Sequence, residues 1–274
     1  MSAASFSVSP GDLWNLIGTD AAPRIIDVRR RDIYAAAPGL IPGARWFDPE
    51  KQSEWVDALD PAVPTVIACK AGHELSQMIA AQLRERGCDS QILHGGYSDW
   101  TDAALPLVSK TAIDRIAPHR PSLWVTRRRP KIDRIACPWL IRRFIDPQAR
   151  FLFVDPPEVL GVARESGAIP FDIEGVEIGH AGERCSFDTL LKLFELEREP
   201  ALARLALIVR GADTARHDLV PEAAGLHAIS LGLSALAQDD DHGLLRRGFS
   251  VYDALLAWLR FASGEKHNWP AKAA

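Results

Sequence analysis

A cysteine at the end of an apolar strand is the residue of this chain best placed for chemistry. Residues 66–68 are apolar and lead directly into Cys69, and the amphipathic stretch 75–86 predicts a helix shortly afterwards. A short turn between a strand and a helix surrounds the thiol with backbone N–H groups, which favour a thiolate and bind anions. The pattern therefore predicts sulfur or oxyanion chemistry at Cys69, with simple packing of a buried cysteine as the alternative.

Three further motifs lie in the same part of the chain as Cys69. They are Asp-Val-Arg at the end of segment 24–29, Ile-Pro-Gly-Ala-Arg at 41–45, and His-Gly-Gly-Tyr-Ser-Asp-Trp at 94–100. In this order and spacing the four motifs resemble the rhodanese family over about residues 6–108. Their joint occurrence is much more specific than any one motif. The resemblance implies a doubly wound α/β domain with a parallel sheet.

The rhodanese resemblance also implies a reaction and a set of site residues. Cys69 would accept a sulfane sulfur as a persulfide and pass it to a nucleophilic acceptor, without any cofactor. The other loop positions are matched by Lys70, Ala71, Gly72, His73 and Glu74, whose N–H groups would spread the charge of the terminal sulfur. Asp27 and Arg29 match the family's Asp-Val-Arg strand end, and we expect Asp27 to brace the loop by hydrogen bonds. The implied partners are a small-molecule sulfur donor and a thiol or oxyanion acceptor.

The residues at the end of the Cys69 loop favour some reactions of the thiol over others. Related loops of phosphatases and arsenate reductases end in an arginine that clamps a tetrahedral oxyanion, and here that position falls on Leu75. Sulfur transfer is therefore favoured over phosphate or arsenate chemistry. Glu74 departs from the cationic or hydroxyl residue found in many rhodaneses, and its carboxylate would disfavour a thiolate and repel an anionic donor such as thiosulfate. A donor other than thiosulfate, or a module that only binds or senses, stays open as an alternative.

Composition and cysteine usage set the class of protein. With 274 residues, 47% of them hydrophobic and 25% charged, the chain is long enough for two globular cores. No segment approaches the roughly 20 uninterrupted apolar residues that span a bilayer, and residues 1–10 lack the features of a signal peptide. We therefore expect a cytoplasmic protein without a membrane partner. Its four cysteines include no CxxC pair, which indicates a reducing compartment. They are Cys69, Cys88, Cys137 and Cys185.

Charge and proline content predict how the chain is divided. Seven basic residues and a single acid lie between Arg127 and Arg143, a pattern typical of a solvated surface, in a chain of net charge −4. The region before residue 124 has more acidic than basic residues, so nucleic acid is not an expected partner.

Prolines gather and periodicity is lost after Leu105. We therefore predict domains at 1–108 and 124–274, joined by a partly extended linker over 109–123.

The region from Trp124 onward predicts a helix-rich α+β unit. Ile135, Trp139 and Phe144 recur at helical spacing, so we expect a helix that buries them and exposes Arg142 and Arg143. Extended stretches are predicted at 151–154 and 176–179, with a short helix at 157–165. Further helices are predicted at 189–197, 200–211, 221–237 and 241–262. Few strands and many helices are typical of an α+β or mainly α unit.

Four segments of this second region resemble the C-terminal domain of ChrB-type chromate-resistance proteins, over about 124–259. They are the Trp139 helix, the turn 179–188, the pair Ala212-Asp213 and the acidic run 239–241. His180, Cys185 and Asp188 would bring imidazole, thiolate and carboxylate groups together in the turn. Asp133 and Asp213 are candidates for further ligands or for hydrogen-bond partners of His180. This donor set suits Zn²⁺ or Fe²⁺.

The alternative for the same turn is structural. Ser186 would then cap the following helix, Asp188 would complement the helix dipole, and Cys185 would pack in the core.

Together the two resemblances predict a rhodanese-type sulfurtransferase coupled to a chromate-resistance domain. Chromate resembles sulfate in shape and charge and consumes thiols, so a persulfide carrier would either restore the sulfur supply or reduce the oxyanion. Two other hypotheses stay open. One is a chromate- or metal-responsive regulator, and the other is a metal-dependent redox protein that uses the His180 turn, with the rhodanese half as a binding module.

Overall fold

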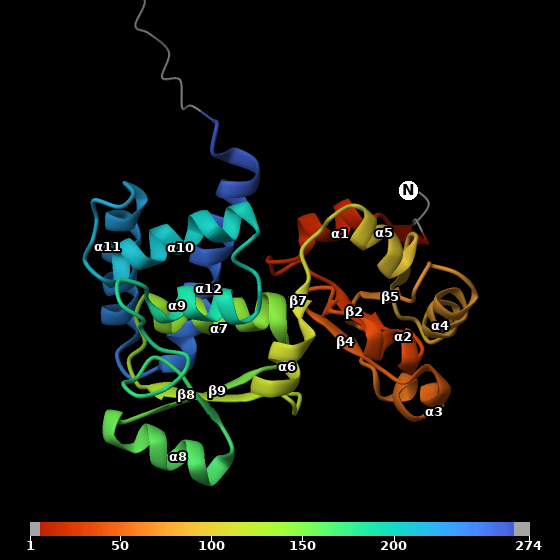
Figure 1. Ribbon diagram of the computed structural model, residues 1–274, viewed down its shortest axis with the longest axis horizontal. Helices are drawn as coiled ribbons and strands as arrows, with labels where there is room; N and C mark the ends of the chain where they lie inside the picture. Colours follow the sequence, from red (N-terminus) through yellow and green to blue (C-terminus); the bar gives the residue numbers. More distant parts are fainter. Residues whose placement is uncertain (1–5, 266–274) are drawn as a thin grey trace, which may run out of the picture.

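The structure is a computed structural model, and it describes residues 6–265. Two parts follow one another along the chain. An α/β part is drawn in red to orange, and a helix-rich part is drawn in green to blue (Figure 1).

A five-stranded parallel sheet forms the centre of the first part, with strand order β1-β6-β5-β2-β4. Its strands are β1 (Ser7–Val8), β2 (Arg24–Asp27), β4 (Ala44–Trp46), β5 (Thr65–Ala68) and β6 (Ser90–Leu93). The helices around it are α1 (Pro10–Leu16), α2 (Arg31–Ala36), α3 (Gln52–Trp55), α4 (Glu74–Glu85) and α5 (Gly96–Asp102), with 3-10 turns at Pro49–Lys51 and Val56–Ala58. The predicted α/β fold with a parallel sheet is confirmed.

The central strand β5 is buried on both faces, as expected for an apolar run in a parallel sheet. Val66 and Ala68 belong to one hydrophobic cluster, whereas Ile67 and Cys69 belong to another that includes Ile79 of α4. Because β2 and β5 are adjacent and parallel, the residues that follow both strands lie at the same edge of the sheet. This edge carries Cys69 and the end of the Asp-Val-Arg motif.

The second part combines a small parallel sheet with a layer of helices. The strand order is β10-β8-β9, and the strands are β8 (Leu123–Arg127), β9 (Arg150–Val154) and β10 (Ile169–Pro170). The helices are α7 (Asp133–Leu140), α8 (Val159–Ser166), α9 (Ser186–Leu193), α10 (Pro200–Asp213), α11 (Glu222–Ala237) and α12 (Asp241–Ala257). Pro156–Glu158 is a 3-10 turn, and the π-helical turns Ile141–Ile145 and Trp258–Ala262 extend α7 and α12. The predicted helix-rich α+β unit is confirmed.

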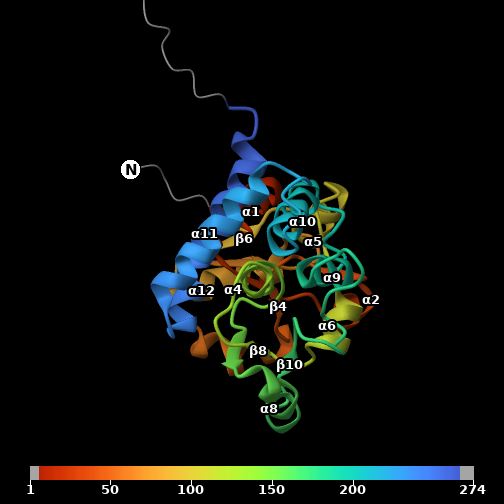
Figure 2. The same ribbon diagram turned by 90° about the vertical axis from the view of Figure 1, so that its left-hand side faces the viewer.

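Figure 2 looks onto this helical part, with α11 and α12 side by side along one flank and α8 against the strands β8 and β10. No helix within residues 6–265 has both the length and the hydropathy that a membrane crossing requires.

The segment between the two parts is more structured than its prolines suggested. It contains β7 (Val108–Ser109), which pairs antiparallel with β3 (Gly39–Leu40), and the helix α6 (Lys110–Ile116). Ala112 and Ile113 of α6 are buried in a hydrophobic cluster that extends from the first part into the second. The expectation of a partly extended linker is therefore wrong over α6, because Ser109 caps this helix and burial of these two apolar side chains stabilises it.

One predicted strand and one predicted surface also differ from the structure. Only Ile178 of the stretch 176–179 forms a β-bridge, and the third strand of the sheet is β10. This strand has two residues and contains a proline, which an edge position tolerates. Arg142 and Arg143 are half-buried rather than exposed: Arg142 donates to the carbonyl of Ala149, and Arg143 pairs with Asp253 of α12 at 2.6 Å. Neighbouring chain segments cover the face that helical periodicity assigned to solvent.

Candidate functional sites

The first candidate site is the loop between β5 and α4, at whose start Cys69 is only 6% exposed. The N–H of Gly72 donates to Cys69 Sγ at 3.1 Å, and Ser76 Oγ lies 3.2 Å from the same sulfur. The loop therefore directs a backbone N–H at the thiol, as its position between a strand and a helix predicted. Such a donor stabilises negative charge on sulfur.

One glycine in the Cys69 loop and two in the motif at 94–100 allow these two segments to pack closely together. Gly72 has φ +70°, and a Cβ there would lie 2.9 Å from the carbonyl oxygen of Leu93. Gly96 has φ +62°, and a Cβ there would lie 2.4 Å from the carbonyl oxygen of Cys69. Gly95 also has positive φ, which L side chains rarely adopt. The motif at 94–100 is thus the surface against which the Cys69 loop packs.

Two hydrogen bonds join this motif to the loop. The N–H groups of Tyr97 and Ser98 donate to the carbonyl oxygens of Cys69 and Lys70, each at 2.9 Å.

Asp27 and Arg29 form a buried ion pair beside the loop. Asp27 accepts hydrogen bonds from the Arg29 backbone N–H and from its guanidinium, at distances of 2.6 to 3.0 Å. The guanidinium carbon lies 3.7 Å from the centre of the Tyr97 ring. The expectation that Asp27 hydrogen-bonds the loop is therefore wrong. Among the described residues, the Asp27 side chain accepts hydrogen bonds from Arg29. Arg29 in turn stacks on the ring of Tyr97, whose backbone N–H is bonded to the loop.

A cavity of about 600 Å³ opens over Cys69. It is lined by Arg29, Arg30, Ile33, Cys69, Lys70, Ala71, His73, Glu74, Leu75 and Gln77. The charge of Arg29 is balanced by Asp27. Arg30 and Lys70 add positive charge to the cavity wall, and Glu74 adds a negative charge. Leu75 lines the cavity near the position where an oxyanion clamp would need an arginine. The cavity thus combines a thiol, an N–H donor and a wall of mixed charge.

Ser76 is a site residue that the sequence did not reveal. It is fully buried on α4, and its hydroxyl donates to the carbonyl oxygen of His73 at 2.9 Å while lying beside Cys69 Sγ. A serine on the apolar face of the amphipathic stretch 75–86 was the available signal. Such a residue needs a hydrogen-bond partner when it is buried.

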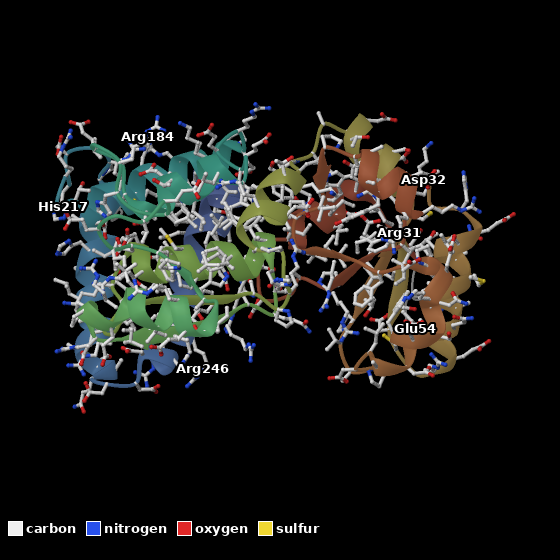
Figure 3. All side chains as sticks on the ribbon, turned by 60° about the horizontal axis from the view of Figure 1, so that its bottom comes forward. Arg31, Asp32, Glu54, Arg184, His217 and Arg246 are labelled. Carbon is white, nitrogen blue, oxygen red and sulfur yellow. The ribbon has the colours of Figure 1, made fainter. Side chains whose placement is uncertain are left out.

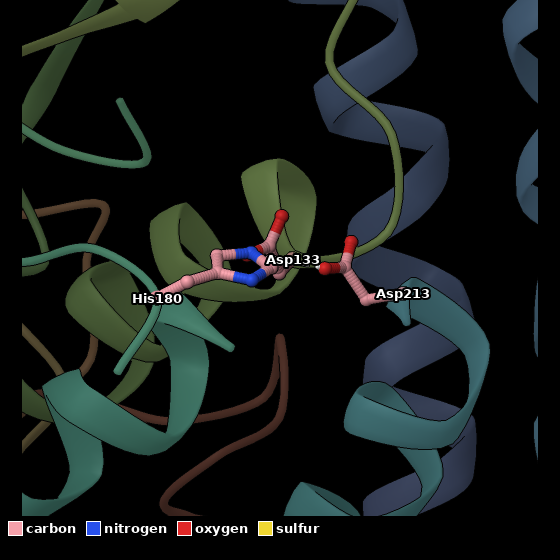
Figure 4. A group of neighbouring side chains, drawn as sticks. All are labelled: Asp133, His180 and Asp213. Carbon is pink, nitrogen blue, oxygen red and sulfur yellow. Dashed lines mark ion pairs between the residues drawn. The ribbon is translucent and has the colours of Figure 1, made fainter. Parts of the chain in front are cut away.

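The second candidate site surrounds His180, in the turn that precedes α9. His180 Nε2 lies 3.3 Å from Asp133 Oδ2, 3.4 Å from Asp172 Oδ1 and 3.2 Å from Asp213 Oδ2. Asp133 begins α7, Asp172 follows β10 and Asp213 ends α10. Figure 4 shows Asp133, His180 and Asp213 approaching one another from separate chain segments. Three carboxylates thus converge on one imidazole nitrogen.

Burial and mutual repulsion change the acidity of this cluster. The hydrogen bond to Asp133 raises the pKa of His180 to about 9. Burial, followed by the charge of Asp133, raises the pKa of Asp213 to about 8. Burial also raises the pKa of Asp172, although Arg127 and Arg134 pair with this carboxylate at 2.8 and 3.2 Å. The cluster therefore favours a positive charge at its centre.

Cys185 and Asp188 do not join the His180 cluster. Asp188 accepts from the Cys185 backbone N–H at 3.0 Å and pairs with Arg210, so it caps α9 and neutralises a neighbouring cation. Burial strongly raises the pKa of the Cys185 thiol. Of the five predicted metal ligands, the structure brings together Asp133, His180 and Asp213 and separates these two. It adds Asp172, which was missed because the short strand before it contains a proline.

Two sequence families match the chain. Residues 9–103 match the family described as Rhodanese-like domain, and residues 124–259 match the family described as ChrB, C-terminal domain. Protein ChrB of Cupriavidus metallidurans is 37% identical over 148 residues, which cover 52% of this chain and 42% of that protein. The chain thus spans less than half the length of this curated relative.

Solved structures resemble the chain over little more than a third of its length. A rhodanese-like domain protein of Staphylococcus aureus is 24% identical, with coverage of 37% of this chain and 96% of that one and a TM-score of 0.32. A thiosulfate sulfurtransferase of Pseudomonas aeruginosa is 27% identical, with coverage of 38% and 19% and a TM-score of 0.32.

Proposed function

We propose that this chain, in which a rhodanese-like domain is joined to a ChrB C-terminal domain, is a sulfurtransferase that carries sulfur as a persulfide on Cys69. The observation that carries this proposal is the Gly72 N–H directed at Cys69 Sγ, 3.1 Å away, beneath a cavity of about 600 Å³. A preorganised N–H at Sγ stabilises the thiolate that attacks the donor and the thiolate that leaves when the acceptor takes the sulfur.

The reaction needs two displacements at sulfur and no cofactor. The Cys69 thiolate attacks the sulfane sulfur of a donor, an S–S bond forms, and the rest of the donor leaves with the electron pair of the broken bond. With thiosulfate the leaving group is sulfite. A nucleophilic acceptor then attacks the terminal sulfur, and Cys69 leaves as the thiolate. The Gly72 N–H lies where Cys69 Sγ carries negative charge, first as the attacking thiolate and again as the thiolate that leaves in the second displacement, whereas the charge of the persulfide is on its terminal sulfur.

The ChrB C-terminal domain supports a role of this sulfur transfer in chromate resistance. Chromate consumes thiols, so cells exposed to it need sulfur for their repair. A persulfide on Cys69 is a form of sulfur that thiol acceptors can take up directly.

The test uses the full chain with thiosulfate and, separately, with 3-mercaptopyruvate. We expect mass spectrometry to detect one added sulfur atom on the peptide that contains Cys69, and cyanide to convert that sulfur to thiocyanate. If neither donor adds sulfur to Cys69 and no thiocyanate forms, the proposed function is wrong.

Replacing Ser76 with alanine is expected to slow thiocyanate formation about tenfold, because the thiolate loses a hydroxyl 3.2 Å away that can turn from the carbonyl of His73 and donate to the sulfur. The matched control is Ser90→Ala, which removes another buried hydroxyl, one that donates to the carbonyl of Ala80 at 2.7 Å. The control should cost similar stability and keep the parent's rate. Equal rates in Ser76→Ala and the parent would count against a role of Ser76 in the reaction.

Replacing Glu74 with glutamine is expected to raise kcat/KM for thiosulfate about threefold at low salt, because a carboxylate that lines the cavity repels the dianion. The gain should shrink as ionic strength rises, and it should be smaller for the monoanion 3-mercaptopyruvate. Glu85→Gln, at the other end of α4, is the control and should change neither value. A salt-independent gain, or none, would show that Glu74 does not act through its charge.

A further inference from the structure

We infer that Asp133, His180 and Asp213 form a binding site for one divalent transition-metal cation, and that Asp172 stands beside it as a carboxylate held by two arginines. The site belongs to the second part of the chain and does not depend on sulfur transfer at Cys69.

The first argument is geometric. One ligand atom from each of Asp133, His180 and Asp213 lies within 4.8 Å of the other two, as expected for groups around a common ion. A protonated Nε2 has a single hydrogen to donate, yet three carboxylate oxygens lie within 3.4 Å of it. When the three carboxylates are ionised, these acceptors outnumber the donor. A cation at the centre would satisfy several of these oxygens at once.

The second argument concerns which charges already have partners. Asp172 is neutralised by Arg127 and Arg134 and accepts from the Ser186 hydroxyl at 2.8 Å. Asp133 is 2% exposed and accepts from the Ser186 backbone N–H at 3.2 Å. Neither Asp133 nor Asp213 forms an ion pair with an arginine or lysine among the described residues, so His180 is their cationic partner. A divalent ion would balance these two carboxylates and leave the imidazole neutral as a ligand.

The third argument is that the chain holds the groups in place. Asp133 lies at the start of α7, and Asp213 is the last residue of α10. The turn that carries His180 is held by the Thr189 hydroxyl, which donates to the carbonyl of Gly179 at 2.8 Å, and by paired hydrogen bonds between Ala181 and Arg184. Ligands that start close together and are held by hydrogen bonds need little reorganisation to bind an ion.

The donor set indicates the class of ion. Two carboxylates and one imidazole suit Mn²⁺, Fe²⁺ or Zn²⁺, and with Cys185 outside the cluster there is no thiolate to favour a soft ion. Because the His180 side chain is 45% exposed, solvent can reach the cluster. Three protein ligands with solvent access are typical of a site that keeps coordination positions open to small molecules.

The test is a titration of the metal-free full chain with Zn²⁺ by calorimetry and with Co²⁺ by visible absorption. We expect one ion per chain in the parent. His180→Ala and Asp213→Asn should each weaken Zn²⁺ binding by about 100-fold and remove the Co²⁺ absorption. Cys185→Ser should bind as the parent does.

The matched controls are His217→Ala and Asp239→Asn. Both residues are exposed, and His217 lies at the outer surface of the helical part (Figure 3). These variants should keep the parent's affinity. Zn²⁺ affinity weaker than millimolar in the parent, or parent-like affinity in both His180→Ala and Asp213→Asn, would overturn the inference and leave a protonated His180 as the charge that balances the carboxylates. Thiocyanate formation should persist in His180→Ala, so this site and the Cys69 reaction can fail separately.

Discussion

Cys69→Ser is expected to abolish thiocyanate formation and the addition of sulfur to the chain. A serine hydroxyl cannot form the S–S bond of a persulfide, and none of the other three cysteines lines the cavity over residue 69. The fold should survive, because serine is close to cysteine in size and can still accept from the Gly72 N–H. We expect a change of about 1 kcal/mol or less in the free energy of unfolding. Thiocyanate assays and denaturant unfolding of the same samples measure both effects.

The control for this variant is Cys88→Ser. Cys88 is also buried, and its thiol donates to the carbonyl oxygen of Val63 at 3.6 Å. A serine hydroxyl at this position can donate to the same oxygen. This variant should retain the parent's activity. Full activity in Cys69→Ser, or complete loss in Cys88→Ser, would remove Cys69 from its proposed role as the sulfur carrier.

Gly96→Ala is expected to unfold the Cys69 loop and to cost about 3 kcal/mol or more of stability. The new Cβ would lie 2.4 Å from the Cys69 carbonyl oxygen and 2.7 and 2.8 Å from the backbone nitrogens of Gly72 and Ala71. All three are backbone atoms, so no side chain can rotate to make room. The positive φ of Gly96 adds strain. Sulfur transfer should be lost together with stability, as measured by denaturant unfolding and by thiocyanate formation.

The matched control is Gly225→Ala in the interior of α11, where a Cβ would meet nothing within 4 Å. Alanine should stabilise that helix by up to about 1 kcal/mol and leave sulfur transfer unchanged. A Gly96→Ala variant with the parent's free energy of unfolding would show that the loop does not pack against Gly96 in solution.

The Cys69 loop could be located from the sequence because its parts are close together in the chain. An apolar strand, a cysteine, a glycine and an amphipathic helix follow one another over about twenty residues, and each signal concerns local backbone geometry. The helices α10 and α11 were placed within two residues at each end for the same reason. The hydrogen-bond partner of Asp27 was predicted wrongly. Its match to a motif indicated a role at the site, but its partner depends on the conformation of the Arg29 side chain.

The helix α6 shows where such local reasoning stops. Prolines on both sides of this helix and a lack of periodicity predicted an extended connector, yet Ala112 and Ile113 are buried in a cluster that the two parts share. Burial of this kind depends on surfaces contributed from elsewhere in the chain, which no local window contains.

The surroundings of His180 depend on packing to an even greater extent. Cys185 and Asp188 were chosen because they follow His180 closely, but helix α9 directs Asp188 to its own first turn and to Arg210. Three other carboxylates reach His180. Asp133 lies at the start of α7, Asp172 follows β10, and Asp213 ends α10. Residue types and local spacing were enough to identify the histidine as a candidate ligand. Its partners follow from the way helices and strands distant in the chain are packed together, because charges interact through space and not along the chain.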